Sequence, residues 1–313
     1  MTPLVSILIP SYNSGRWLAA TLESALAQTW PRCEIIIVDD GSTDDSLTIA
    51  RRYESRGVRI AIQTNAGASA ARNHGLRLAL GEFIQFLDAD DLLSPEKITA
   101  QVGLLERVGT DCVATCRWGR FAGDPGAAAF VDDAVFRDFG PADWLLAHTG
   151  AARMMHPAAW LVPRAVAGRA GPWDETLSLN DDGEYFARVA LAARRIAFSP
   201  AGASFYRSAL PGSLSRRRDR RALESVAHSV ELIAAHLRRA EDSPRVRHSL
   251  ADYWQRLVYE IYPDAPDLCH RAESEVRKLG GSGLLPDMGS RERLAAQVLG
   301  WKLARRLRLL VSF

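Results

Sequence analysis

The chain has 313 residues, of which 47% are hydrophobic and 24% are charged, a composition typical of soluble globular proteins. This composition excludes a disordered or fibrous chain. Its 39 basic and 37 acidic residues give a formal net charge of +2, so the overall charge offers no argument for a nucleic-acid partner and none is expected.

The cysteines and apolar runs bear on the compartment. Four cysteines at irregular spacing are too few for a disulfide framework, which favours a reducing, cytoplasmic compartment. The N-terminal apolar run follows no basic region and is too short for an export signal. No segment approaches the ~20 apolar residues of a membrane-spanning helix. Any membrane contact is therefore expected to be peripheral, on the inner face of the cell membrane.

The first 105 residues alternate short apolar runs with amphipathic segments. Runs rich in β-branched residues predict buried strands, and apolar residues on one helical face predict helices. Predicted strands cover 4–10, 33–40, 58–63 and 82–87, and predicted helices cover 15–28, 41–57 and 68–81. This alternation predicts an α/β fold with a mainly parallel sheet and helices on both faces.

The rest of the chain divides into two further parts. Residues 106–212 are less regular, and strands are predicted within 111–118, 158–163 and 196–200. This mixed pattern predicts that the sheet continues with an antiparallel portion. Residues 213–313 are predicted to be mostly helical.

Polar clusters follow the first four predicted strands, at 10–13, 39–42, 63–67 and 88–91. Parallel sheets bind ligands beyond the carboxyl ends of their strands, so these clusters predict one site. The last cluster places three aspartates within four positions, and a cation best relieves their repulsion. Oxygen ligands from few protein groups suit Mg²⁺ or Mn²⁺, which leave positions open for phosphate oxygens. A single aspartate there could instead cap the next helix.

The familiar phosphate-binding loops are missing from the sequence. Neither Gly-x-Gly-x-x-Gly nor Gly-x-x-x-x-Gly-Lys-Ser/Thr occurs, so a metal more than a glycine-rich loop would hold phosphates here. Asp39 or Asp40 could accept the N–H of a nucleobase.

Four motifs occur in order in the first 100 residues: VSILIPSYN, EIIIVDDGSTDDS, NAGASAARNHG and GEFIQFLDADDLLSPEKI. Together they resemble the inverting family 2 glycosyltransferases, which use nucleotide-diphospho-sugars. The resemblance is dense over residues 4–100 and thinner to about 207. It implies a GT-A fold, a Rossmann-like mixed sheet flanked by helices, to which the predicted helical C-terminal region is added as an extension. Residues 1–105 would then bind the nucleotide-sugar, 106–212 would bind the acceptor, and 213–313 would be the extension.

The resemblance also implies donor-binding roles by position. The donor would contact residues at the strand ends: Pro10, Tyr12, Asn13, Asp39, Asp40, Asn65, Gly67, Arg72, Asp88 and Ala89. Asp40, with or without Asp39, would contact the base, most often uracil in this family. Asp88 would face the ribose or sugar, and Asp90 would hold the divalent ion with Asp91 close by. Turn chemistry explains Asn65 and Gly67 equally well.

Inverting transfer also needs a base that activates the acceptor hydroxyl on the face opposite the leaving group. A metal replaces the general acid by neutralising the leaving diphosphate. An acidic turn leads into a predicted amphipathic helix within residues 179–191, where the family carries an acidic pair that supplies the base. Asp182 matches by position, and Asp181 stands in place of the commoner Glu, which leaves the choice between them open. A helix cap is the plainer alternative.

Three residues are candidates for the acceptor side. His156 and Trp160 could border the acceptor, although Trp160 lies in an apolar run typical of a core. Arg207 lies in the segment 205–216, whose glycine and proline suit a lid that closes over the diphosphate.

Residues 290–313 place Leu294, Val298, Trp301 and Leu303 at near-helical spacing among arginines. Two fates fit such a helix: it lies on an anionic membrane surface, or it packs its apolar stripe onto the main domain. The first would suit a lipid-linked acceptor.

The sequence therefore predicts a metal-dependent inverting glycosyltransferase of cell-envelope polysaccharide synthesis. It would move a sugar from a UDP-sugar donor to a saccharide or lipid-linked saccharide acceptor. One alternative is nucleotidyl transfer, which usually needs a glycine-rich basic loop where this chain offers only Gly15 and Arg16. The other is a non-catalytic scaffold that binds nucleotide-sugars.

Overall fold

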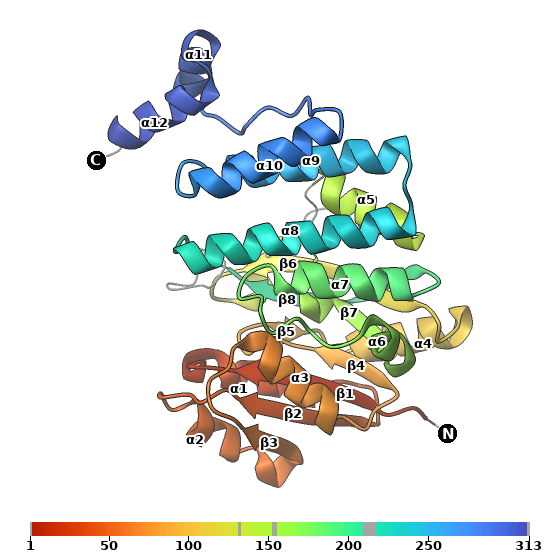
Figure 1. Cartoon of the computed structure of the whole chain (residues 1–313). Helices are drawn as coiled ribbons and strands as arrows, with labels where there is room; N and C mark the ends of the chain where they lie inside the picture. The colour runs from red at the N-terminus through yellow and green to blue at the C-terminus, as the bar shows by residue number, and fades with distance from the viewer. Residues whose placement is uncertain (1, 131–132, 152–154, 209–216, 312–313) are drawn as a thin grey trace. The chain divides into compact units, whose positions relative to one another are not determined.

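The computed structural model describes residues 2–130, 133–151, 155–208 and 217–311 (Figure 1). The chain forms two compact units, the first made of residues 1–148 and 153–216 and the second of residues 149–152 and 217–313. The second unit therefore includes a short piece of chain that precedes its main part.

The strands of the first unit are β1 (Val5–Ser11), β2 (Cys33–Asp39), β3 (Val58–Ile62), β4 (Phe83–Phe86), β5 (Leu92–Leu93), β6 (Val113–Phe121), β7 (Trp160–Pro163) and β8 (Ile196–Arg207). Its helices are α1 (Gly15–Leu26), α2 (Ser46–Arg51), α3 (Ala68–Leu78), α4 (Lys97–Val108), α6 (Arg164–Ala170) and α7 (Asp181–Ala192). Short 3₁₀ turns cover Glu54–Arg56, Pro125–Ala127 and Pro157–Ala159. The remaining helix, α5 (Pro141–Ala151), begins in the first unit and ends in the second.

The strands form one eight-stranded sheet in the order β3-β2-β1-β4-β7-β6-β8-β5. The first four strands pair in parallel, and β7 runs antiparallel to both β4 and β6. The predicted mixed sheet, parallel in its first half and partly antiparallel beyond it, is confirmed.

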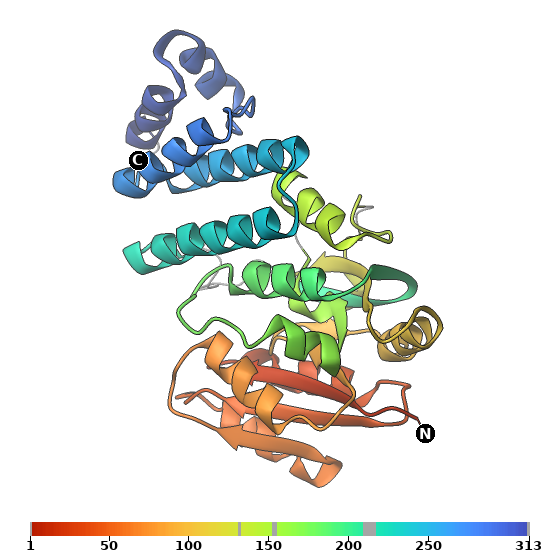
Figure 2. The ribbon, with the colours of Figure 1, turned by 45° about the vertical axis from the view of Figure 1, so that its right-hand side comes forward.

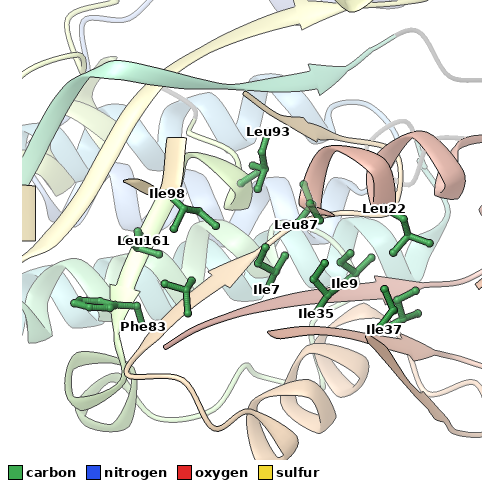
Figure 3. Packing of buried hydrophobic residues seen from close by; sticks show 14 of the residues in the cluster. Ile7, Ile9, Leu22, Ile35, Ile37, Phe83, Leu87, Leu93, Ile98 and Leu161 are labelled. Carbon is green, nitrogen blue, oxygen red and sulfur yellow. The ribbon is translucent and has the colours of Figure 1, made fainter. Parts of the chain in front are cut away.

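Both faces of the parallel strands are covered, which explains their uninterrupted apolar runs. Ile7, Ile9, Ile35 and Ile37 join a buried cluster that includes residues of α1 and α4 (Figure 3). The opposite face carries Leu8 and packs against α3. The approach is close, since a Cβ added to Gly75 of α3 would lie 3.5 Å from the Leu8 Cβ.

One predicted element is shorter in the structure. The predicted helix 41–57 is reduced to α2 and a 3₁₀ turn that ends at Gly57, whose φ is 87°. The residues before α2 instead form hydrogen bonds with the loop after β1. Asp44, for example, accepts a hydrogen bond from the Gly15 N–H at 3.0 Å.

The second unit is helical, as predicted for this part of the chain. It contains α8 (Arg220–Ala240), α9 (Pro244–Ile261), α10 (Pro266–Lys278), α11 (Ser290–Leu299) and α12 (Trp301–Val311). Figures 1 and 2 both show α8, α9 and α10 running alongside one another. Asp219 caps α8 and Ser243 caps α9, each accepting a hydrogen bond from a backbone N–H in the first turn. In the described part of the chain, no helix has both the length and the apolarity needed to span a bilayer.

Candidate active site

The loops after β1 and β2 are joined through Asn13, which has a positive φ of 47°. Its amide oxygen accepts a hydrogen bond from the Thr43 N–H at 2.8 Å, and its own N–H donates to Ser42 Oγ at 3.0 Å. Asn13 therefore organises the loop, and Pro10 beside it is half-buried. Tyr12, 51% exposed, is the aromatic side chain of this loop that is open to a ligand.

The two aspartates after β2 have different surroundings. Asp40, expected at the base, accepts hydrogen bonds from Gln63 Nε2, Ala66 N and Gly67 N, each at 2.8 Å. Its carboxylate is thus occupied in holding the loop after β3. Asp39 accepts from the Ser42 N–H through Oδ2, while its buried Oδ1 has no hydrogen-bond partner among the residues that the structure describes. An unpaired buried acceptor costs free energy until a donor reaches it, so Asp39 is the better candidate for the base.

The loop after β3 contains Asn65 and Gly67, both exposed. Gly67 precedes α3 with a φ of 97°, a conformation that favours glycine. Its N–H is the one that donates to Asp40. The turn role anticipated for Gly67 therefore accounts for its residue type.

Arg72 on α3 connects the aspartate cluster after β4 with the acidic first turn of α7. Its guanidinium donates to Asp88 Oδ1 and to Asp181 Oδ2, each at 2.7 Å. It also stacks on Trp173, with its central carbon 4.4 Å from the ring centroid. Buried ion pairs of this kind are stable only where both charges find partners. Arg72, expected beside the nucleotide, therefore acts as a bridge between two segments far apart in the sequence.

Among the aspartates of the cluster, Asp90 has a carboxylate with no side-chain partner in the described contacts. Burial raises the pKa of Asp90 to about 7, and the negative charges of Asp91 and Asp88 add to the effect. A divalent cation would relieve both causes, so the chemistry of the site fits Mg²⁺ or Mn²⁺. Within the described ranges, no three His, Cys, Asp or Glu side chains are grouped to hold a metal. Asp90 would thus supply one ligand, and phosphate and water oxygens the others.

The two candidate bases, both in the first turn of α7, differ in their hydrogen bonds. Asp181 accepts hydrogen bonds from both Arg72 and Ser69 Oγ, the latter at 3.0 Å. Asp182 accepts one, from the Gly183 N–H at 2.8 Å. Burial raises the pKa of Asp182 to about 6, and the adjacent Asp181 carboxylate contributes. A carboxylate with a raised pKa and few partners suits a general base, which favours Asp182.

Comparison with known proteins bears directly on this site. The family model of glycosyl transferase family 2 matches residues 6–129, which contain β1 to β4 and the aspartate cluster. Residues 6–129 are a family 2 glycosyltransferase domain.

Relatives and solved structures are similar to a larger part of the chain. An uncharacterized glycosyltransferase of Rickettsia typhi is 31% identical over 185 residues, covering 58% of this chain and 57% of that protein. The Escherichia coli protein WfaP, named UDP-Glc:alpha-D-GlcNAc-diphosphoundecaprenol beta-1,3-glucosyltransferase, is 45% identical over 105 residues, 33% of this chain and 41% of that protein. The chain thus spans about half the length of these curated relatives.

Residues 1–349 of Staphylococcus aureus TarS, crystallised with UDP-GlcNAc, share the fold. That structure has a TM-score of 0.64 at 19% identity and covers 88% of this chain and 89% of its own. The expected GT-A fold is therefore confirmed.

The structure gives Asp91 and His156 a structural role in the first unit. Both are almost fully buried. Asp91 pairs with His156 Nδ1 at 2.9 Å and accepts from the Arg207 N–H at 2.8 Å, so each of its oxygens has a partner within the protein, which makes Asp91 a weaker candidate than Asp90 for the metal expected there. His156 Nε2 lies 2.8 Å from Ser204 Oγ, which completes a Ser-His-Asp arrangement. Because Ser204 is also fully buried, this arrangement cannot act as a nucleophile on a substrate.

Two other expected contacts are also buried. Trp160, considered for the acceptor, is fully buried and stacks on Phe186 at 4.8 Å between ring centroids, as a core residue does. Ala89, considered for the donor, packs in the core, and its carbonyl accepts from Thr21 Oγ1.

Arg207 is the last residue of β8 and contacts the aspartate cluster. Its Nε donates to the Asp90 carbonyl at 2.8 Å, and its guanidinium lies between Trp17 and Phe121, 4.3 Å from each ring. Arg207 therefore positions the backbone of Asp90. The proposed lid extends into residues 209–216, which lie outside the described residues.

Sequence reasoning missed two residues of this site, Ser69 and Trp173. Ser69 occurs in the motif NAGASAARNHG, so its place beside Arg72 in the first turns of a helix was a usable signal. Trp173 had no such signal. Asn73 binds its backbone with two hydrogen bonds of 2.8 and 2.9 Å, a contact that exists only in the folded chain.

Proposed function

We propose that this chain is a metal-dependent inverting glycosyltransferase that moves a sugar from a UDP-sugar to a hydroxyl of a saccharide or lipid-linked saccharide. The observation that carries this proposal is the Arg72 bridge. Its guanidinium lies 2.7 Å from Asp88, in the motif expected to hold the donor. It lies equally close to Asp181, in the acidic turn expected to supply the base. Donor and acceptor chemistry would then share one site.

The donor and acceptor classes are inferred from relatives and from the site together. The name of WfaP specifies a UDP-glucose donor and a diphosphoundecaprenol-linked sugar acceptor, and the TarS structure contains UDP-GlcNAc. In this chain, exposed Tyr12 could stack on uracil, and Asp39 Oδ1 could accept its imide N–H.

The mechanism follows from the surroundings of each carboxylate. Asp182 would remove the proton of the acceptor hydroxyl as that oxygen attacks the anomeric carbon and the UDP oxygen departs. Arg72 would hold Asp181 out of this role through its hydrogen bond, and it would hold Asp88 toward the donor. Asp90 would hold the divalent ion, which when bound neutralises charge on the leaving diphosphate. The proton ends on Asp182 and is then released to solvent.

The test is a panel of nucleoside diphosphate sugars, measured by thermal shift with and without Mn²⁺ and then by release of UDP. We expect UDP-sugars to raise the melting temperature only with Mn²⁺, because a ligand that binds the native state stabilises it by mass action. In the Asp90→Asn variant, Mn²⁺ should no longer enable UDP-sugars to raise the melting temperature. UDP release that requires an acceptor would support transfer.

Other outcomes would support the alternatives. Pyrophosphate release from a nucleoside triphosphate would favour nucleotidyl transfer. Metal-dependent UDP binding without turnover of any donor, over a broad panel of acceptors, would favour a scaffold.

The roles of Asp39 and Asp40 can be separated by matched substitutions. Asp39→Asn is expected to weaken UDP binding about tenfold, because the base would lose a charge-assisted hydrogen bond. Asp40→Asn should mainly destabilise the protein, by about 1–3 kcal/mol, because an amide cannot accept all three hydrogen bonds that hold the loop. Isothermal titration with UDP and Mn²⁺ and urea unfolding measure the two effects. Unchanged UDP affinity in Asp39→Asn would remove Asp39 from the base site.

A further inference from the structure

The two C-terminal helices leave a set of apolar side chains in solvent. On α12, Leu303, Leu307 and Leu310 recur every three or four residues, so they share one face, and each is at least 40% exposed. We refer to these three residues as the leucine stripe. On α11, Leu294 and Val298 form a similar exposed pair. Contiguous exposed apolar side chains of this kind mark an interaction surface.

The opposite face of α12 packs against other residues of the second unit. Trp301 packs edge-on against Tyr259 and Tyr262, with ring centroids 4.8 and 5.1 Å away, and Ala304 is buried. Arg305 lies on this attached side and donates to the Tyr259 carbonyl. The face that α12 uses for packing therefore differs from the leucine stripe, and the stripe is left available.

The charges carried by α11 and α12 are almost all positive. Residues 290–311 contain six basic residues, Arg291, Arg293, Lys302, Arg305, Arg306 and Arg308, and one acidic residue, Glu292. Glu292 is buried and paired with Arg308 at 3.0 Å. Lys302 and Arg306 lie four positions apart on α12 and form a basic row beside the leucines, in which Lys302 also pairs with Glu273 of α10.

Two hollows flank this helix, and basic side chains outnumber acidic ones in the lining of each. One, of about 360 Å³, is lined by Lys302, Arg306, His270 and Glu273 among others. The other, of about 340 Å³, is lined by Arg218, Arg305, Arg308, Glu260 and Asp264 among others. The arginine and lysine side chains of each hollow could receive a phosphate-bearing group.

We propose that α11 and α12 dock the second unit on an anionic lipid bilayer. The leucine stripe enters the interfacial region, and the basic row and hollows bind the headgroup phosphates. Charge complementarity selects this partner. A second copy of the chain covering the stripe would bring two basic rows together, whereas an anionic surface neutralises them. The inference does not depend on the transfer reaction.

The test is flotation of the full chain with vesicles of phosphatidylcholine mixed with phosphatidylglycerol, compared with phosphatidylcholine alone. We expect binding to the anionic vesicles only, decreasing as salt is added because surface charges are screened. Leu303→Ser, Leu307→Ser and Leu310→Ser combined should reduce binding by about tenfold or more, since the stripe supplies the apolar burial. Lys302→Gln and Arg306→Gln should each weaken binding about fivefold.

The matched control is Leu285→Ser, an 84% exposed leucine outside both helices, which should bind as the parent does. Melting temperatures of all variants check that the fold is kept. Failure of the full chain to bind anionic vesicles would overturn the proposal, as would equal binding to both vesicle types. Light scattering that shows a dimer dispersed by the triple serine variant, without vesicle binding, would assign the surface to a second copy instead.

Discussion

Replacing Asp182 by Asn is expected to lower the rate of sugar transfer by about 10²–10⁴-fold, the usual contribution of a general base. UDP affinity should change little, because Asp182 is expected to act on the acceptor. Asp181 is not expected to substitute for it, since its carboxylate is held by Arg72 and Ser69 at 2.7 and 3.0 Å. Turnover with the UDP-sugar selected by the donor panel, together with titration of UDP, measures both effects.

The pH dependence gives an independent check on the same residue. Burial raises the pKa of Asp182 to about 6, and only the ionised carboxylate can accept the proton. The rate should therefore rise with pH through about 6 and level off above it, and this limb should disappear in Asp182→Asn. The matched control is Asp124→Asn. Asp124 is exposed and caps a short turn, and an asparagine can also fill that capping role. A larger loss in Asp181→Asn than in Asp182→Asn would reverse the assignment of the base.

Replacing Arg72 by Met is expected to destabilise the protein by about 3–5 kcal/mol, the effect of removing one partner from a buried ion pair. The substitution keeps much of the apolar volume above Trp173 but leaves Asp88 and Asp181 close together without a cation. Urea unfolding followed by tryptophan fluorescence measures the loss. Sugar transfer should also fall, because neither the donor aspartate nor the base turn would be held in place.

The control for this prediction is Arg59→Met. The Arg59 side chain is 47% exposed, and its guanidinium pairs with Glu34 at 2.9 Å. Surface ion pairs of this type contribute about 0–1 kcal/mol, so the control should be nearly as stable as the parent. Adding Asp181→Asn to Arg72→Met should recover part of the lost stability, because it removes one of the two unpaired charges. Equal stability of the Arg72→Met and Arg59→Met variants would contradict the bridge.

Much of the fold could be predicted because it rests on local patterns. The continuous apolar runs at 4–10 and 33–40 are buried on both faces, so they could be recognised as central parallel strands without knowing their partners. The ends of such strands converge on one edge of the sheet, which also located the candidate site. The second predicted helix came out shorter, because hydrogen bonds between loops, such as Asp44 to the Gly15 N–H, outweighed its helical pattern.

The division of tasks within the site depended on contacts between distant segments. The sequence alone determined that aspartates gather after β2 and β4 and at the start of α7, because residue type and strand periodicity are local properties. It could not determine that Asp40 would hold a loop while Asp39 Oδ1 stays unpaired, or that Asp91 would be buried against His156. Only the tertiary structure decided which carboxylates keep free oxygens, because each of those oxygens is satisfied or left open by donors elsewhere in the chain.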